Sequence, residues 1–224
     1  CDVFCEQGAF DLEESRRVLA AGKDAGLALH VHAEQFSSFG GARLAAELGA
    51  LSADHLEAAT AEDAGALAAA GVVAIGLPGC NLFLDQQARM PARMLLERGV
   101  RVALATDYNP GTCPTLSLPL VMTLGCSRLK LSAAEAMAAV TCEAARALGR
   151  GGELGTLQPG ARADLAAFPV PSHRHLPYYF GTGEAAWVLV DGKEVYRGRW
   201  DGKAPGEQGP AQKQPGRGDR MQRS

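Results

Sequence analysis

Three short runs of the sequence carry side chains that can bind a metal ion or move a proton. They are His30-Val31-His32-Ala33-Glu34-Gln35, Ser52-Ala53-Asp54-His55-Leu56 and Ala105-Thr106-Asp107-Tyr108-Asn109-Pro110-Gly111-Thr112. Neutral imidazole is a good ligand for zinc or iron, and histidine is the most frequent general acid or base. A carboxylate directly after an apolar strand is costly to bury unless a metal ion or hydrogen bonds satisfy it. These residue types are therefore compatible with metal-assisted hydrolysis.

Each candidate also has a plain structural interpretation. His32 could be a histidine satisfied by local hydrogen bonds, and His30 lies two residues deeper in the strand, where a structural role is favoured. His55 could be a loop histidine held by its neighbours, and Asp107 could simply open an Asx-turn. The pair in His173-Arg174-His175 lies between prolines in a loop-like stretch, where a solvated or structural role is favoured.

Strands alternate with helical patterns over the first two thirds of the chain. The apolar runs predict five strands, at residues 1–6, 27–32, 51–56, 72–77 and 101–107. Helical spacing and capping residues predict helices at residues 11–25, 41–48, 61–70, 87–98, 118–130 and 132–148, and Pro91 is expected to shift the start of the fourth. Alternation of this kind favours the α/β class with a parallel sheet. In a (β/α)8 barrel the active site lies at the strand ends, where the three polar runs fall.

A doubly wound sheet also fits five strands, but it usually has a glycine-rich phosphate loop after its first strand. The corresponding Glu6-Gln7-Gly8 does not match that loop. Beyond Gly149 the pattern changes, and residues 163–168, 187–190 and 194–196 predict a small antiparallel β module with a hairpin at Asp191-Gly192. We expect barrel elements over residues 1–150, the β module over 151–200 and a disordered tail over 201–224.

Composition excludes some classes of function. The net charge is −3, with acidic and basic residues interspersed, so nothing favours a nucleic-acid or membrane partner. The six cysteines include no Cys-x-x-Cys pair, which favours a reducing cytosol and buried, inert thiols over a disulfide framework or a cysteine zinc site. We therefore expect a cytoplasmic protein.

Taken together, the motifs resemble the amidohydrolase superfamily and, within it, the imidazolonepropionase family. The matching pieces are Asp2-Val3-Phe4-Cys5-Glu6, His32-Ala33-Glu34-Gln35, Ser52-Ala53-Asp54-His55-Leu56, Leu77-Pro78-Gly79 and the run from Ala105 to Thr112. Their order and spacing make the resemblance specific, and it extends from about Cys1 to Trp200. It implies the C-terminal part of a (β/α)8 barrel, about strands four to eight, followed by part of a small β-sandwich module.

The resemblance also implies roles for individual residues. His32 and Asp107 look like ligands of a zinc or iron ion, and His55 and Asp107 look like the catalytic pair that activates water. Substrate or product contacts are implied for Gln35, Asn109, Gly111 and Thr112, whereas Glu6 receives no role. The implied reaction is hydrolysis of 4-imidazolone-5-propanoate to N-formimino-L-glutamate in histidine degradation.

The chain departs from the family pattern in one large respect. The family's remaining metal ligands come from a His-x-His motif on the first barrel strand, which these residues do not supply. Two alternatives therefore stay open. The protein could be another cyclic amidohydrolase or a related deaminase, or this chain could be an inactive half-barrel fragment. An open half-barrel exposes sheet edges, so we would expect it to aggregate or to form a homodimer.

Overall fold

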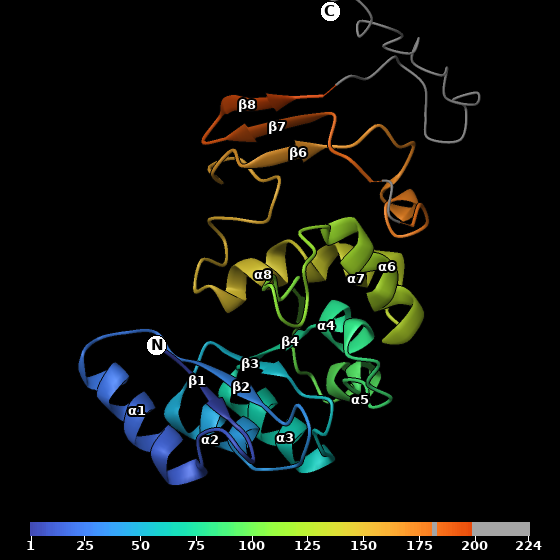
Figure 1. The fold of residues 1–224 in the computed structure, drawn as a ribbon. Coiled ribbons are helices and arrows are strands. Elements are labelled where there is room, and N and C mark those ends of the chain that lie inside the picture. Colours follow the sequence, from blue (N-terminus) through green and yellow to red (C-terminus); the bar gives the residue numbers. More distant parts are fainter. Residues whose placement is uncertain (181–182, 199–224) are drawn as a thin grey trace, which may run out of the picture.

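A five-stranded parallel sheet forms the centre of the protein in the computed structural model, which describes residues 1–180 and 183–198. The strands pair in the order in which they occur: β1 (Asp2–Cys5), β2 (His30–Ala33), β3 (Ser52–His55), β4 (Val73–Gly76) and β5 (Val102–Leu104). Each strand is followed by at least one helix before the next begins (Figure 1). The predicted α/β class with a parallel sheet is confirmed.

Eight α-helices connect or follow the strands. They are α1 (Leu12–Asp24), α2 (Gly41–Leu48), α3 (Ala61–Ala70), α4 (Pro78–Phe83), α5 (Ala92–Glu97), α6 (Leu118–Arg128), α7 (Ala133–Ala139) and α8 (Cys142–Ala147), within the described residues. Capping boxes begin α1 at Asp11, α3 at Thr60 and α7 at Ser132. Each box satisfies backbone N–H groups that the first turn leaves free, so short helices of modest propensity begin at a defined residue.

The helices differ from expectation in three places. The single helix predicted over residues 132–148 is divided into α7 and α8 at Val140-Thr141, where the Thr141 hydroxyl donates to the Met137 carbonyl at 2.7 Å. A β-branched residue whose hydroxyl bonds the preceding turn competes with the helical ladder. Helix α4 was not expected at all, because six residues give too short a pattern. His173-Arg174-His175, expected as a loop, forms a single 3-10 turn.

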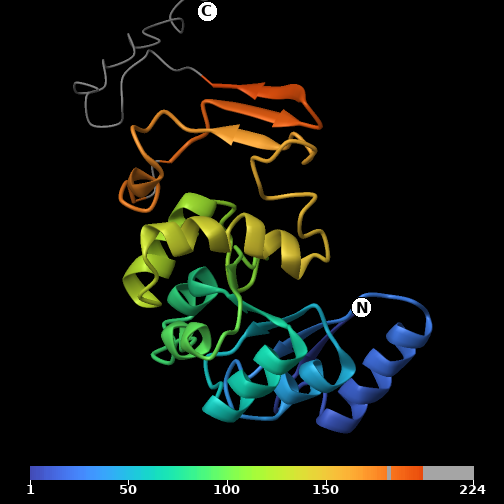
Figure 2. The same ribbon diagram turned by 180° about the vertical axis from the view of Figure 1, so that it is seen from behind.

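One face of the sheet, called here the outer face, packs against α1, α2, α3 and α5 (Figures 1 and 2). Alternate residues of the strands supply its apolar side chains: Val3, Cys5, Val31, Ala33, Ala53, Ala74, Val102 and Leu104. They meet buried leucines of the helices, among them Leu19, Leu44, Leu67 and Leu95. This packing is the main hydrophobic core.

The opposite or inner face carries the other set of alternating residues. On β1, β2 and β3 these are polar, namely Asp2, His30, His32, Ser52 and Asp54, together with Phe4. On β4 and β5 they are Val73, Ile75 and Ala103, which α8 covers with Ala144 and Ala147. The inner face is therefore apolar beneath α8 and polar beside it.

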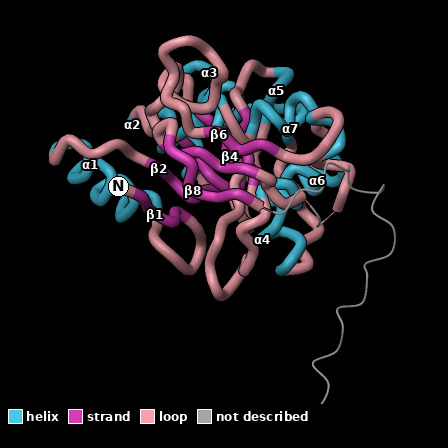
Figure 3. Tube along the Cα trace, turned by 90° about the horizontal axis from the view of Figure 1, so that it is seen from above, coloured by secondary structure: helices cyan, strands magenta, loops and turns pink. Residues whose placement is uncertain are grey.

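The C-terminal part forms a three-stranded antiparallel sheet of β6 (Leu165–Ala167), β7 (Trp187–Val190) and β8 (Lys193–Arg197). Asp191 and Gly192 connect β7 to β8 with positive φ angles of 52° and 72°, as the hairpin signal predicts. In Figure 1 helices α6, α7 and α8 lie between the two sheets, and Figure 3 shows the strands in the middle with helices around them. The predicted tail over residues 201–224 lies outside the described residues.

No helix among the described residues has the length and apolar character needed to cross a membrane. All six cysteines fall within the described residues and are free, and Cys5, Cys80 and Cys113 are buried. Burial raises the pKa of the Cys80 thiol to about 12, so this side chain stays protonated beside Asp107. Its chemistry is that of a small apolar residue rather than of a nucleophile.

Candidate active site

An open pocket of about 460 Å³ lies where β1, β2, β3 and β5 end. It is lined by Asp2, Val3, Phe4, His32, Gln35, Phe36, His55, Leu84, Asp107 and Thr112. Five of the residues singled out in the sequence therefore meet here, although they come from three different strand ends: His32, Gln35, His55, Asp107 and Thr112. Asn109 and Gly111 are not among the lining residues.

His32 occupies the end of β2 and is fixed by a carboxylate on the neighbouring strand. Its Nδ1 lies 3.0 Å from Oδ1 of Asp2, and its ring meets the Phe4 ring edge-on at a centroid distance of 6.3 Å. The hydrogen bond to Asp2 raises the pKa of His32 above its usual value, against the effect of burial. Because Nδ1 is engaged, Nε2 is the nitrogen left to bind a ligand.

His55 reaches the same pocket through an unusual backbone. His55 lies two residues after Ala53, whose side chain belongs to the outer face. Strand alternation would therefore direct the His55 side chain to the outer face as well, away from the pocket. Both His55 and Leu56 have positive φ angles, of 77° and 64°, which costs on the order of 1–3 kcal/mol for each such residue. The ring of His55 lines the pocket, with its centroid 5.4 Å from that of His32. The strained turn thus brings two imidazoles together that the strand pattern alone would separate.

Asp107 and Thr112 are presented by a turn that Asn109 holds closed. The Asn109 Oδ1 accepts hydrogen bonds from the backbone N–H of Gly111 at 2.9 Å and of Thr112 at 2.7 Å. The Asn109 amide donates to the Asp107 carbonyl at 2.9 Å and to the Thr112 hydroxyl at 2.7 Å. The run from Asp107 to Thr112 therefore forms a turn, as its structural interpretation predicts. The same turn places Asp107 and Thr112 in the pocket, as the functional interpretation requires.

Glu6, for which no role was predicted, anchors one wall of the pocket. Its buried carboxylate accepts from the backbone N–H of Phe36 at 2.9 Å and of Ser37 at 3.2 Å, and from the Ser37 hydroxyl. Burial by itself would raise the pKa of Glu6, but these hydrogen bonds and one from the Gln7 N–H outweigh it and lower the pKa. Glu6 thereby fixes the loop that carries Gln35 and Phe36.

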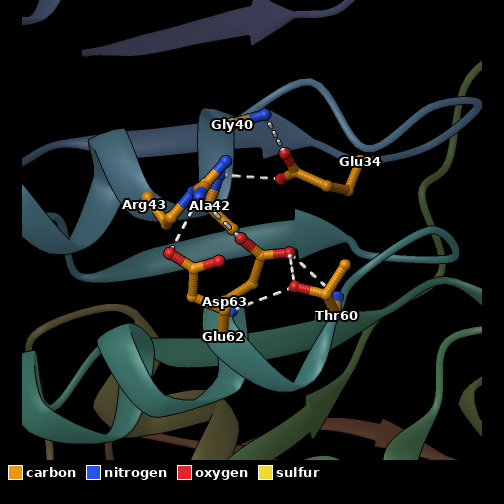
Figure 4. A network of polar contacts seen from close by, with 7 residues as sticks. All are labelled: Glu34, Gly40, Ala42, Arg43, Thr60, Glu62 and Asp63. Carbon is orange, nitrogen blue, oxygen red and sulfur yellow. Dashed lines mark hydrogen bonds and ion pairs between the residues drawn. The ribbon is translucent and has the colours of Figure 1, made fainter.

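A second buried carboxylate closes the same loop at its other end. Glu34 accepts from the N–H groups of Gly40 at 2.6 Å and Ala42 at 2.7 Å, where α2 begins (Figure 4). Burial raises the pKa of Glu34 despite these bonds. From α2, Arg43 reaches Glu62 and Asp63 of α3 at 3.1 and 3.3 Å, which ties the two helices together.

The inner face beside the pocket holds a further polar network. His30 Nδ1 lies 2.8 Å from the Ser52 hydroxyl, which donates to Asp54 at 2.7 Å. This contact supports the structural interpretation of His30. Burial raises the pKa of Asp54, and ligand atoms of Asp2, His32 and Asp54 lie within 4.8 Å of one another. Asp2 was missed in the sequence because its partner depends on the register between β1 and β2.

Comparison with known proteins identifies the family. The sequence model of the amidohydrolase family matches residues 7–195. The chain belongs to the amidohydrolase family.

Two curated relatives of this chain are imidazolonepropionases. The chain is 49% identical to the imidazolonepropionase of Geobacillus kaustophilus (strain HTA426) over 202 residues, which is 90% of the chain and 47% of that protein. It is 44% identical to the imidazolonepropionase of Alkaliphilus metalliredigens (strain QYMF) over 195 residues, 87% of the chain and 46% of that protein. The chain spans about half the length of the curated relatives that it matches.

Solved structures show the same fold at lower sequence identity. An adenosine deaminase from Xanthomonas campestris with bound zinc superposes with a TM-score of 0.72 at 23% identity, over 85% of this chain and 50% of that one. A 5-methylcytosine deaminase from Klebsiella pneumoniae gives a TM-score of 0.74 at 15% identity, over 89% and 56% of the two chains. These likenesses support the fold.

The residues present fit part of a metal centre of the kind that amidohydrolases use. His32 and Asp107 line one pocket from two strands, and His32 has one ring nitrogen engaged by a carboxylate and the other left for a ligand. A metal-binding histidine usually donates its second N–H to a carboxylate or carbonyl in this way. Imidazole with carboxylate is a donor set that suits zinc or iron.

Proposed function

We propose that this chain forms the part of an imidazolonepropionase that carries His32, His55 and Asp107, and that the reaction is hydrolysis of 4-imidazolone-5-propanoate to N-formimino-L-glutamate. The observation that carries the proposal is the convergence of these three side chains on one pocket. The 49% identity to an imidazolonepropionase supports this substrate over that of another cyclic amidohydrolase or of a deaminase.

His32 and Asp107 would hold a zinc or iron ion, which when bound lowers the pKa of its water from about 15.7 to roughly 7. His55 faces the same space and can accept a proton from the attacking water. The water oxygen adds to the ring carbonyl carbon, the adjacent C–N bond breaks, and that carbon becomes a carboxylate. Asp107 can carry the second proton of that water to the departing ring nitrogen, while the proton taken up by His55 passes to solvent, so that both protons are accounted for.

The remaining lining residues would orient the imidazolone ring of the substrate and enclose it. Thr112 and Gln35 supply polar groups, while Phe4, Phe36 and Leu84 supply apolar walls. Two of the lining residues, Asp2 and Asp107, are acidic and none is Lys or Arg. Any Lys or Arg donor for the propionate group of the substrate would therefore come from outside these lining residues. We expect turnover only where the rest of the protein supplies those donors and the remaining metal ligands.

The experiment measures metal content and imidazolone propionate hydrolysis, on this chain and on a protein extended upstream to the relatives' length. We expect metal and activity in the extended protein, and their loss in His32→Ala. The matched control is His30→Ala, which removes a histidine of the same strand and face that contacts Ser52 instead. Equal turnover of His32→Ala and His30→Ala would contradict the proposed role of His32.

A further inference from the structure

A buried carboxylate, that of Glu57, lies close to the imidazole of His55. The Oε2 of Glu57 lies 3.8 Å from the Nδ1 of His55, and the two side chains are only 3% and 4% exposed. Neither atom has a hydrogen-bond partner within the described part of the chain. Two unsatisfied polar atoms buried opposite each other are unusual, since nearly all buried polar groups in native proteins are paired.

The backbone holds this pair in place from both sides. The N–H of Leu56 donates to the Ala33 carbonyl at 3.1 Å, and the N–H of Ala58 donates to the Glu34 carbonyl at 2.8 Å. The turn that contains Glu57 is therefore bound to the end of β2, next to His32. Strained positive φ angles at His55 and Leu56 persist because these bonds determine the turn.

We infer that Glu57 is a positioning residue for His55. An Nδ1–H that points at the Glu57 carboxylate fixes the neutral ring as the Nδ1–H tautomer, as a carboxylate does for the histidine of a catalytic triad. Nε2 then carries the lone pair and is the nitrogen that serves the pocket. This inference rests on the proposed function, and it sharpens the role of His55 to that of a proton acceptor for water.

Glu57 can be replaced without an expected loss of folding stability. Replacement of a buried, poorly paired charge by an apolar side chain of similar size is often neutral or stabilising. Glu57→Met keeps the length of the side chain and removes its acceptor, whereas Glu57→Gln keeps an oxygen that can accept from Nδ1–H. The matched control is Glu143→Met, since Glu143 also has a buried oxygen without a hydrogen bond but lies on α8.

The first readout is the tautomer of His55 by ¹⁵N NMR of the histidine rings in the full chain, which needs neither metal nor turnover. We expect the Nδ1–H tautomer in the unmodified protein and in Glu57→Gln and Glu143→Met, and its loss in Glu57→Met. An Nε2–H tautomer in the unmodified protein, or no change in Glu57→Met, would overturn the inference.

The second readout is turnover in the protein extended to the relatives' length. We expect Glu57→Met to lower kcat by about 10- to 100-fold with little change in KM, as loss of a supporting partner commonly does, and Glu57→Gln to restore part of it. An unchanged kcat in Glu57→Met would also overturn the inference. If the unmodified protein does not hydrolyse imidazolone propionate, the proposed function fails, while the tautomer still decides whether Glu57 positions His55.

Discussion

The two faces of the five-stranded sheet are built from alternate residues of the same strands, yet they differ in kind. Val3, Val31 and Ala53 of the outer face are buried beneath the helices, whereas Asp2, His32 and Asp54 of the inner face are polar. Strands of a parallel sheet usually read as continuous apolar runs because both faces are covered. Alternation of polar and apolar residues along these parallel strands therefore indicates which face of the sheet holds the candidate site.

The inner face is polar over only part of the sheet. On β4 and β5 it turns apolar, and α8 covers it with alanines. The polar side chains are confined to β1, β2 and β3, next to the pocket. Stability and function are thus separated between neighbouring residues of one strand, which makes the separation testable by substitution.

The largest effect should come from placing a charge on the outer face. Val31→Asp buries an unpaired carboxylate in the main core, where Val31 is 0% exposed, and we expect a loss of at least about 4 kcal/mol of unfolding free energy. His32→Asp places the same side chain one residue further on the inner face, and we expect folding to persist. Urea unfolding followed by circular dichroism compares the two. Equal destabilisation would contradict the division of the faces.

A cavity in the helix layer should have the next largest effect. Leu67 of α3 is 0% exposed against the outer face, so Leu67→Ala should cost about 2–5 kcal/mol. Leu157→Ala is the matched control, because Leu157 is 88% exposed and its loss should change stability by about 0.5 kcal/mol or less. Urea midpoints measure both, and a cost at Leu157 similar to that at Leu67 would refute the assignment of the core.

The substitution Glu6→Gln tests whether a buried carboxylate stabilises the loop beside the pocket. Glu6→Gln leaves donors of Phe36 and Ser37 without their charged acceptor, and we expect a cost of about 1–3 kcal/mol at pH 7. Amide hydrogen exchange at Phe36 and Ser37 should become faster, and exchange in α3 should change less.

The same substitution has a defined pH dependence. The pKa of Glu6 is lowered in the folded protein, so its contribution is present above the unfolded pKa of about 4.3. That contribution is lost as the pH falls through the folded pKa. The difference in stability between the unmodified protein and Glu6→Gln should therefore shrink on acidification below about pH 4.3. A difference that grows on acidification would show that Glu6 is not held as a carboxylate.

The smallest effect is expected at the surface pair between Arg93 and Glu135. Their side chains are 42% and 36% exposed and lie 2.8 Å apart, and the bond from Arg93 together with the Ser132 cap lowers the pKa of Glu135 to about 2. Solvent screening limits Glu135→Gln to a cost of about 1 kcal/mol or less. The cost should be present above about pH 4.5 and disappear toward pH 2, as thermal melts over that range would show.

Much of the fold follows from local pattern. The five strands, the capping boxes at Asp11 and Ser132 and the hairpin at Asp191-Gly192 depend on residues near one another in the sequence, and the structure contains each of them. The strand-end runs also gave the pocket residues His32, His55 and Asp107, because the carboxyl ends of parallel strands meet at one edge of a sheet.

The remaining features depend on contacts between distant segments. Asp2 meets His32 only through the register of two strands, and Glu6 meets Ser37 only where two loops approach. The positive φ angles of His55 and Leu56 oppose local preference and are held by bonds to another strand. The pairing of Glu57 with His55 follows from that turn. No local pattern encodes these contacts, so candidate residues could be predicted but their supporting partners could not.

The most direct test of the account is metal binding together with imidazolone propionate hydrolysis in the protein extended to the relatives' length, for the unmodified protein, Asp107→Ala and Asp85→Ala. Asp85 shares with Asp107 a positive φ of 52° but does not line the pocket. We predict bound metal and turnover in the unmodified protein and in Asp85→Ala, with at least about a thousandfold loss of turnover in Asp107→Ala. Near-normal metal content and turnover in Asp107→Ala would contradict the assignment of the pocket as the active site.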